Sequence, residues 1–550
     1  PICRYGSQPL GQADRAGQAA APGAPMRASA RATLLQQGLL VLTFAAVTPA
    51  AARAQLSSYE ELQRFSAVLN HIRTNYPDSV TYNGLVRAAI DGMLRSLDPH
   101  SWFASREDYE KLSALERGEL AVTGILFELA DGVPTVLSYL PKSPAEKAGI
   151  LPGDRILRVD GVPVAGLPPK SIALRLSGEK GSRVVVGLER GPRLEPDTFS
   201  VKLKRVFMEV RSVSAARMVD SQTGYVRLDA FGPTGADEVR KAVKQLRSSK
   251  ARQLILDLRG NPGGIVTEAV DLAAEFLPAK TLVFTTRGRK KAVNEDFRTK
   301  GSGEFVDLPL ILLLDEGSAS AAEALAGSLQ DHDRALIVGR RSFGKALMQT
   351  GFLVPSGFVE LTVGHVLTPS GRFIQRRYQG LAIEQYYAFA GNAGAEQDTL
   401  QLFSTDRGRE VRGGGGIAPD VRVPAPAKPP TWWSVAADSG YDDAVADSVA
   451  LTLPTEASAR AAWLAGTGQW EARLLPPFLE RVRSRLKLEA RPDSATAFAM
   501  ARRLAARAAF VRWPPDGGTD LILATDSDVR AALDAFPRLG VLLSGPGHKP

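Results

Sequence analysis

The chain has few of the side chains that form disulfides or bind metals. It contains one cysteine, Cys3, and five histidines, whose positions show no spacing typical of a metal site. A single cysteine excludes a disulfide framework within the chain, and no metal is expected. Aromatic residues are scarce, at 7%, and do not alternate with basic residues as in proteins that bind single-stranded nucleic acid. Residues 1–54 hold five arginines and one aspartate, so much of the net charge of +9 lies there and nucleic acid is not expected as a partner.

An apolar run long enough to span a membrane is missing as well. Residues 26–31 are basic, residues 39–47 are mainly apolar and residues 50–54 are small, which is the order typical of a secretory signal peptide. We therefore predict a signal peptide over 26–54, cleaved after Ala54, and export to the periplasm. An uncleaved signal would leave the protein associated with the membrane. Residues 1–25 are interpreted as upstream sequence outside the fold.

The most informative stretch runs over residues 310–349. The apolar run 310–314 predicts a strand buried on both faces, and the alanine-rich segment 321–329 predicts a helix. Ser320 therefore stands where a strand joins a helix, and the N–H groups and dipole of a helix start favour negative charge. A serine at this place is either a nucleophile whose oxyanion meets ready-made donors or a helix N-cap.

Four short motifs follow one another in this stretch: Ser318-Ala319-Ser320-Ala321-Ala322-Glu323, Leu329-Gln330-Asp331, Arg334-Ala335 and Phe343-Gly344-Lys345-Ala346, followed by Gln349. Their order resembles that of the carboxy-terminal processing proteases, an S41 family of serine peptidases with a Ser–Lys dyad. Ala322 replaces a serine of the family pattern and Ala346 a glycine. The resemblance implies that Ser320 is the nucleophile, Lys345 the general base and Gln349 the residue that orients the lysine. His365, a rival general base, is disfavoured because Lys345 matches the family's spacing.

A second motif stands at the end of another apolar strand. The apolar strand 254–258 ends in Arg259-Gly260-Asn261-Pro262-Gly263-Gly264, where the two glycines let backbone N–H groups approach a ligand. An ordinary turn between strand and helix is the alternative. The carboxy-terminal processing proteases, which this chain resembles, use this motif for part of the oxyanion hole. The resemblance implies that the Gly263 and Ala321 N–H groups are the donors here. Strands that alternate with helices predict an α/β core with a mainly parallel sheet, and the resemblance implies a core similar to the crotonase/ClpP superfamily.

Residues 119–204 resemble a PDZ domain of the bacterial protease type. Ser143 begins a short helix that ends at Gly149, a strand covers 155–159, and Asp160-Gly161 predicts a tight hairpin. A PDZ domain binds a peptide C-terminus as an added strand, and the loop implied for this is Thr123-Gly124-Ile125-Leu126. Leu126 stands where the family commonly has glycine. A small β-domain without a ligand is the alternative.

The remaining segments complete a multidomain α/β chain. We predict an N-terminal helical domain over 55–115, with helices over 59–76 and 82–96, and a protease core over 205–423. A proline-rich linker, 424–430, precedes a mostly helical extension, 431–550, with helices over 457–464, 479–488 and 496–510. His100, beside Asp98 and Pro99, is interpreted as part of a helix-ending turn. The extension carries no motif of the family, and its role is not predicted.

The sequence thus predicts a secreted serine endopeptidase that binds protein C-termini through a PDZ domain and cleaves peptide bonds through an acyl-enzyme intermediate. This mechanism needs no metal and no organic cofactor. It requires desolvation of Lys345, because a lysine at the usual pKa of about 10.4 is protonated. A catalytically silent PDZ adaptor or scaffold and a crotonase-type acyl-CoA enzyme are the alternatives. Protein or peptide substrates are the expected partners; a dimer formed through the N- or C-terminal helices, and an adaptor protein, stay open.

Overall fold

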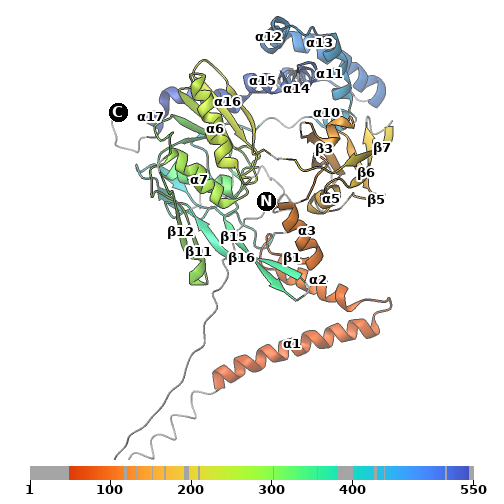
Figure 1. Cartoon of the computed structure of the whole chain (residues 1–550), viewed down its shortest axis with the longest axis vertical. Coiled ribbons are helices and arrows are strands. Elements are labelled where there is room, and N and C mark those ends of the chain that lie inside the picture. Colours follow the sequence, from red (N-terminus) through yellow and green to blue (C-terminus); the bar gives the residue numbers. More distant parts are fainter. Residues whose placement is uncertain are drawn as a thin grey trace, which may run out of the picture. The chain divides into compact units, whose positions relative to one another are not determined.

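The computed structural model describes residues 49–543 with internal gaps (Figure 1). The gaps are residues 117–119, 131–132, 141, 152, 166, 168, 191–196, 209–210, 302, 356, 382–385, 387–400, 426–429, 439, 488 and 514–516. Residues 1–25, most of the predicted signal peptide and part of the predicted linker lie outside the described residues. The chain divides into two compact units between residues 103 and 104.

The N-terminal unit contains two helices, α1 (Pro49–Asn75) and α2 (Tyr82–Arg95). The helices predicted over 59–76 and 82–96 are confirmed, although α1 begins earlier than predicted. The N–H of His100 donates to Asp98 Oδ1 at 2.7 Å, so His100 belongs to the turn after α2. None of the described helices is both long and apolar enough to cross a membrane. The chain continues into β1 (Trp102–Ser105) and α3 (Arg106–Glu116).

A small β-rich domain follows α3 in the chain. Its elements are β2 (Ile125–Ala130), β3 (Val133–Tyr139), α4 (Pro144–Lys147), β4 (Arg155–Val159), β5 (Val162–Pro163), α5 (Pro169–Leu176), β6 (Arg183–Arg190) and β7 (Asp197–Lys204). The strands form an antiparallel sheet in the order β2-β3-β4-β6-β7, with β5 paired to β4. Ser143 caps α4 by accepting a hydrogen bond from the Glu146 N–H, as its place before the helix predicts. Since β2 lies at the sheet edge, a further strand can pair with it.

The region predicted as the protease core contains a six-stranded sheet in the order β19-β14-β13-β10-β9-β8. The strands are β8 (Val213–Met218), β9 (Thr223–Leu228), β10 (Gln253–Asp257), β13 (Leu310–Leu314), β14 (Leu336–Gly339) and β19 (Val421–Arg422). All described pairs are parallel except β8 with β9. The predicted α/β core with a mainly parallel sheet is therefore confirmed, and the apolar run 310–314 is a fully buried strand.

Both faces of this sheet are covered by helices. Leu310, Leu312 and Leu314 of β13 pack in a cluster with α6 (Gly235–Ser248), α7 (Val266–Phe276) and α8 (Ala321–Asp331). Ile311 and Leu313 point to the other face, because side chains alternate along a strand, and pack in a cluster with α16 (Ser527–Ala535). A helix of the C-terminal extension is therefore one layer of the core.

A second, antiparallel sheet carries the segment after Lys345. It includes β11 (Leu282–Gly288), β12 (Glu295–Arg298), β15 (Leu347–Val354) and β16 (Gly357–Leu367), with the short 3₁₀ turn Lys291–Val293 before β12. β15 and β16 form a hairpin, and β16 also pairs with β11. A small hairpin of β17 (Leu402–Ser404) and β18 (Glu410–Arg412) follows.

The C-terminal extension is helical, as predicted. Besides α16 it contains α10 (Thr431–Asp438), α11 (Tyr441–Thr452), α12 (Ala457–Ala465), α13 (Thr467–Leu486), α14 (Ser494–Arg512), α15 (Gly517–Thr525), the 3₁₀ turn Phe536–Arg538 and α17 (Leu539–Leu542). The helix predicted over 479–488 is part of α13, which begins at Thr467 and contains Pro476 and Pro477. Trp470, Leu474 and Phe478 are fully buried at helical spacing across these prolines, so packing maintains the helix where the prolines alone indicate a break.

The packing of α16 on the sheet gives a stability prediction. Leu313→Ala should lower the free energy of unfolding by about 2 to 5 kcal/mol, because it leaves a cavity under α16. The control is Leu353→Ala on β15, where the side chain is 71% exposed and the loss should be small. Urea unfolding of both variants is the measurement, and equal stabilities would contradict the packed α16 layer.

Candidate active site

Ser320 occupies the predicted joint between β13 and α8. It is the N-cap residue of α8 and has a φ of 56°, which is unusual for a residue with a side chain. The preceding loop is fixed to the loop after β10: the Ala319 N–H donates to the Asn261 carbonyl at 2.9 Å, and the Ser318 hydroxyl donates to the Leu258 carbonyl at 2.8 Å. Ser320 therefore has a strained backbone at a helix start, and the two residues before it are fixed by hydrogen bonds.

A buried carboxylate, Glu323, connects Ser320 with the loop that carries Lys345. Its Oε2 accepts hydrogen bonds from the Ser320 N–H and the Lys345 N–H, both at 2.8 Å. Its Oε1 accepts from the Gly344 N–H at 2.6 Å and from the Ser342 hydroxyl at 2.5 Å. The two predicted catalytic residues thus share one acceptor atom through their backbones, although they stand on different elements.

No role was predicted for Glu323 from the sequence. A glutamate three residues after a serine at a helix start is the capping-box pattern, and this signal indicates the bond to the Ser320 N–H. The bonds to residues 342–345 could not be read from spacing, because they join loops that follow different strands. Burial raises the pKa of Glu323 to about 7, although the four donors act in the opposite direction.

Gly263 lies against Ser320, the predicted nucleophile. Its φ is +97°, and a Cβ at this position would lie 2.8 Å from Ser320 Cβ and 2.9 Å from Ala321 N, so glycine alone fits. Its N–H donates to Asn261 Oδ1 at 2.8 Å. The Ala321 N–H, by contrast, has no acceptor among the described residues. The Ala321 N–H is thus available as a donor. An oxyanion role for Gly263 stays a prediction, and it requires the Gly263 N–H to break its hydrogen bond to Asn261 Oδ1 or to share itself between this oxygen and the oxyanion.

Gln349 lies on β15 opposite Thr362 of β16, and its amide donates to the Thr362 hydroxyl at 3.2 Å. Its predicted role in orienting Lys345 stays a prediction. The exposed ring of His365, the rival general base, packs against Phe373 with 4.4 Å between ring centroids. In the described part of the chain, no group of three His, Cys, Asp or Glu side chains could hold a metal ion.

The predicted carboxylate loop, Thr123-Gly124-Ile125-Leu126, leads into the edge strand β2. Gly124 has a φ of +83°, and a Cβ there would lie 2.2 Å from Ser143 Cβ. Its carbonyl accepts a hydrogen bond from the Leu140 N–H at 2.8 Å, and Leu126 is 39% exposed. The loop is thus fixed beside the start of α4 at the edge where an added strand would pair, and its binding of a carboxylate stays a prediction.

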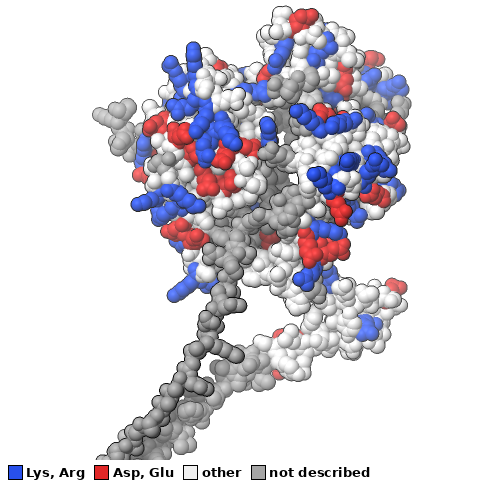
Figure 2. All heavy atoms as spheres, in the orientation of Figure 1, with Lys and Arg blue, Asp and Glu red and all other residues white. Residues whose placement is uncertain are grey.

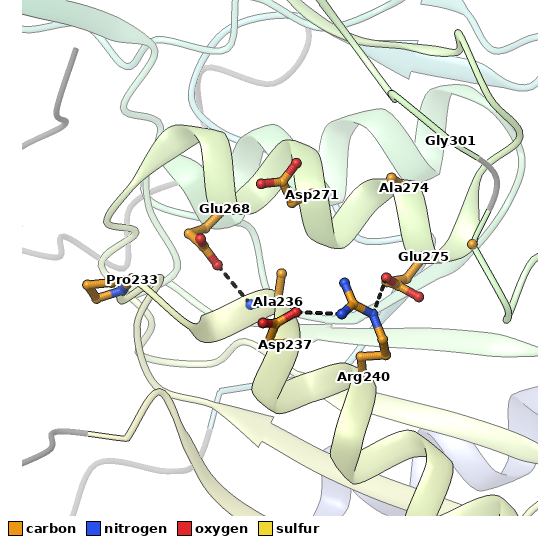
Figure 3. A pocket seen from close by; sticks show the side chains of 10 residues that line it. Pro233, Ala236, Asp237, Arg240, Glu268, Asp271, Ala274, Glu275 and Gly301 are labelled. Carbon is orange, nitrogen blue, oxygen red and sulfur yellow. Dashed lines mark hydrogen bonds and ion pairs between the residues drawn. The ribbon is translucent and has the colours of Figure 1, made fainter. Parts of the chain in front are cut away.

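An acidic cavity of about 340 Å³ lies between α6 and α7 (Figure 3). Its carboxylates have structural partners: Glu268 accepts a hydrogen bond from the Ala236 N–H at 3.0 Å, and Arg240 pairs with Asp237 and Glu275, both at 2.5 Å. Figure 2 shows acidic and basic side chains interspersed over this face of the molecule. The cavity contains none of the predicted site residues, and its charges support the packing of the two helices.

Comparison with known proteins relates two segments of this chain to known families. Residues 222–385, which include Ser320, Lys345 and Gln349, match Peptidase family S41, and residues 135–190 match the PDZ domain. The chain is 34% identical over 326 residues to a carboxy-terminal-processing protease of Bartonella bacilliformis, covering 58% of this chain and 74% of that protein. It is also 34% identical over 296 residues to a carboxyl-terminal-processing protease of Synechocystis sp., covering 52% and 68%. A solved photosystem II D1 C-terminal processing protease is similar at 26% identity, with a TM-score of 0.41, covering 65% of this chain and 86% of that one.

The four bonds to Glu323 predict the effect of Glu323→Gln. An amide group has one acceptor oxygen and turns its NH₂ toward the other donors, so two of the four donors lose their acceptor. The free energy of unfolding should fall by about 3 kcal/mol. Glu304→Gln is the control, because that carboxylate is exposed and pairs with Lys244 at the surface. Equal stability of the two variants in urea would show that Glu323 does not hold the loops.

Because the pKa of Glu323 is raised, the stability that is lost in Glu323→Gln should depend on pH. Between the ordinary value of 4.5 and about 7, the folded protein binds the Glu323 proton more tightly than the unfolded chain. The stability from this group is therefore fully present below the lower value and is lost as the pH rises toward the higher one. Unfolding at about pH 5 and about pH 8 should show a larger difference between wild type and Glu323→Gln at the lower pH. A difference that grows with pH would mean that the carboxylate stays ionised throughout.

Proposed function

The chain belongs to the carboxy-terminal processing proteases of peptidase family S41, which are serine-type peptidases, and from this premise we propose that Ser320 is its nucleophile and Lys345 its general base. The observation that supports this is the shared Glu323 oxygen, which accepts the backbone N–H groups of both residues. Family membership also favours an enzyme over a silent adaptor and over an acyl-CoA enzyme.

The proposed reaction begins with a proton transfer. Neutral Lys345 takes the proton of the Ser320 hydroxyl, and Oγ attacks the carbonyl carbon of the peptide bond. The resulting oxyanion meets the Ala321 N–H at the positive end of the α8 dipole, with Gly263 as the second predicted donor. The lysine then gives its proton to the leaving amine, and an acyl-enzyme remains. Water, deprotonated by the same lysine, hydrolyses this ester and restores Ser320.

We further propose that the PDZ domain binds the C-terminal segment of the substrate. Its edge strand β2 offers backbone groups for an added strand, and the loop at residues 123–126 precedes that strand. Protein or peptide C-termini are therefore the proposed substrates. Export, which rests on the sequence of residues 26–54, is part of the same proposal, as is a dimer formed through terminal helices.

The nucleophile and base are tested by Ser320→Ala and Lys345→Ala. Each variant should lower kcat on a peptide substrate by about 1,000-fold or more and keep the wild-type melting temperature. The wild-type rate should rise with pH as the lysine loses its proton. Ser248→Ala, on the exposed face of α6, is the control and should keep full activity. Turnover by pure Ser320→Ala protein would refute the nucleophile.

The PDZ proposal is tested by amidating the substrate's C-terminus. Removing the terminal charge should raise KM by about tenfold and leave kcat nearly unchanged, because binding is lost outside the reacting centre. The same peptide acetylated at its N-terminus is the control. Equal values of kcat/KM for free and amidated peptides would count against recognition of the carboxylate.

A further inference from the structure

Two arginines, in loops that lead to Gly263 and Lys345, share a carboxylate from the C-terminal extension. Arg259 begins the loop after β10, and Arg340 begins the loop after β14 that leads to Lys345. Asp528 Oδ2 accepts from Nη1 of Arg259 and from Nη1 of Arg340, each at 3.0 Å. Asp528 is 2% exposed, so the bridge is withdrawn from water and little screened.

Each of the two arginines also pairs with other carboxylates. Asp526, the N-cap of α16, also pairs with Arg259 Nη1 at 3.0 Å and accepts the Asp528 N–H at 2.8 Å. Arg259 Nη2 reaches the fully buried Asp257 at 2.6 Å. Arg340 also pairs with Glu316, at 3.1 Å, in the loop before Ser320. The network therefore includes one residue of the loop that leads to Gly263, one of the loop before Ser320 and one of the loop that leads to Lys345.

The helix that supplies Asp528 is itself anchored on the strands that end at these loops. Val529 and Ala532 of α16 are buried in one cluster with Leu313 of β13 and Val338 of β14. β13 ends six residues before Ser320, at Leu314, and β14 ends at Gly339, immediately before Arg340. Asp528 is thus placed by packing rather than by a flexible contact.

We propose that Asp528 is a positioning residue of the protease: it holds the Arg259 and Arg340 loops together so that Gly263, Ala321 and Lys345 keep their places around Ser320. The inference rests on the proposed function. Like charges repel strongly where water is excluded, and among the residues that the structure describes Asp528 is the carboxylate that contacts both guanidinium groups. Without it the two loops would separate. Residues 526–543 lie outside the segments that match the family models. The proposal therefore gives part of the C-terminal extension, which carries no family motif, a role in the catalytic core.

The test compares Asp528→Asn with Asp534→Asn in the full chain. Asp534 is an exposed carboxylate on the same helix, and its loss should leave activity unchanged. Asp528→Asn should lower kcat by about 10- to 100-fold, with KM within about threefold of wild type, because misplaced reacting groups cost rate rather than binding. The kcat is counted per active site titrated with a serine-directed fluorophosphonate probe, well below the melting temperature. A merely structural Asp528 would give fewer titrated sites, each with normal kcat.

Arg340→Gln serves as the second variant, which is needed where Asp528→Asn folds poorly. Arg340→Gln removes the other side of the bridge and should lower kcat per site in the same way, and the double variant should lose no more than the worse single one. Normal kcat per site in both single variants, or losses that multiply in the double variant, would overturn the positioning role. Ser320→Ala is measured in parallel: if it stays active, the proposed function fails, whereas an inactive Ser320→Ala beside a normal Asp528→Asn refutes Asp528 alone.

Discussion

The Glu323 carboxylate is the point to which both halves of the candidate site are attached. A carboxylate removed from water is costly unless hydrogen bonds replace its hydration, and here four donors do so. One oxygen accepts the N–H groups of both Ser320 and Lys345, so neither loop can move away without leaving a buried carboxyl oxygen partly unsatisfied. The separation of Ser320 and Lys345, the proposed nucleophile and base, therefore depends on this side chain, although Glu323 takes no part in the proposed chemistry.

The parallel sheet explains why these loops meet. β10, β13 and β14 are adjacent and parallel, so the loops at their carboxyl ends emerge at the same sheet edge. These loops lead to Gly263, Ser320 and Lys345 respectively. Helices cover both faces of the sheet, and the one supplied by the C-terminal extension brings Asp528 into contact with Arg259 and Arg340 of two of these loops. Packing thus fixes the strands, and buried charges fix the loops at their ends.

Local features could be predicted from the sequence, and distant contacts could not. The strand and helix around Ser320 follow from an apolar run and an alanine-rich run, because propensity and burial act within a few residues. The bonds from Glu323 to the lysine loop, and the Asp528 bridge to Arg259, depend on how separate elements pack, which spacing does not encode. The same limit applies to Gly263, whose closeness to Ser320 was predicted while the Asn261 acceptor for its N–H was not.

The most direct measurement is a crystal structure of the protein with a phosphonate bound covalently by a serine-directed inhibitor. The account predicts the phosphorus on Ser320, a phosphonyl oxygen within hydrogen-bond distance of the Ala321 N–H, and the Lys345 amine beside Ser320 Oγ. Glu323 should still accept the backbone N–H groups of Ser320 and Lys345. A phosphonate on another residue, or a lysine loop detached from Glu323 with its amine turned away from Ser320, would contradict the account.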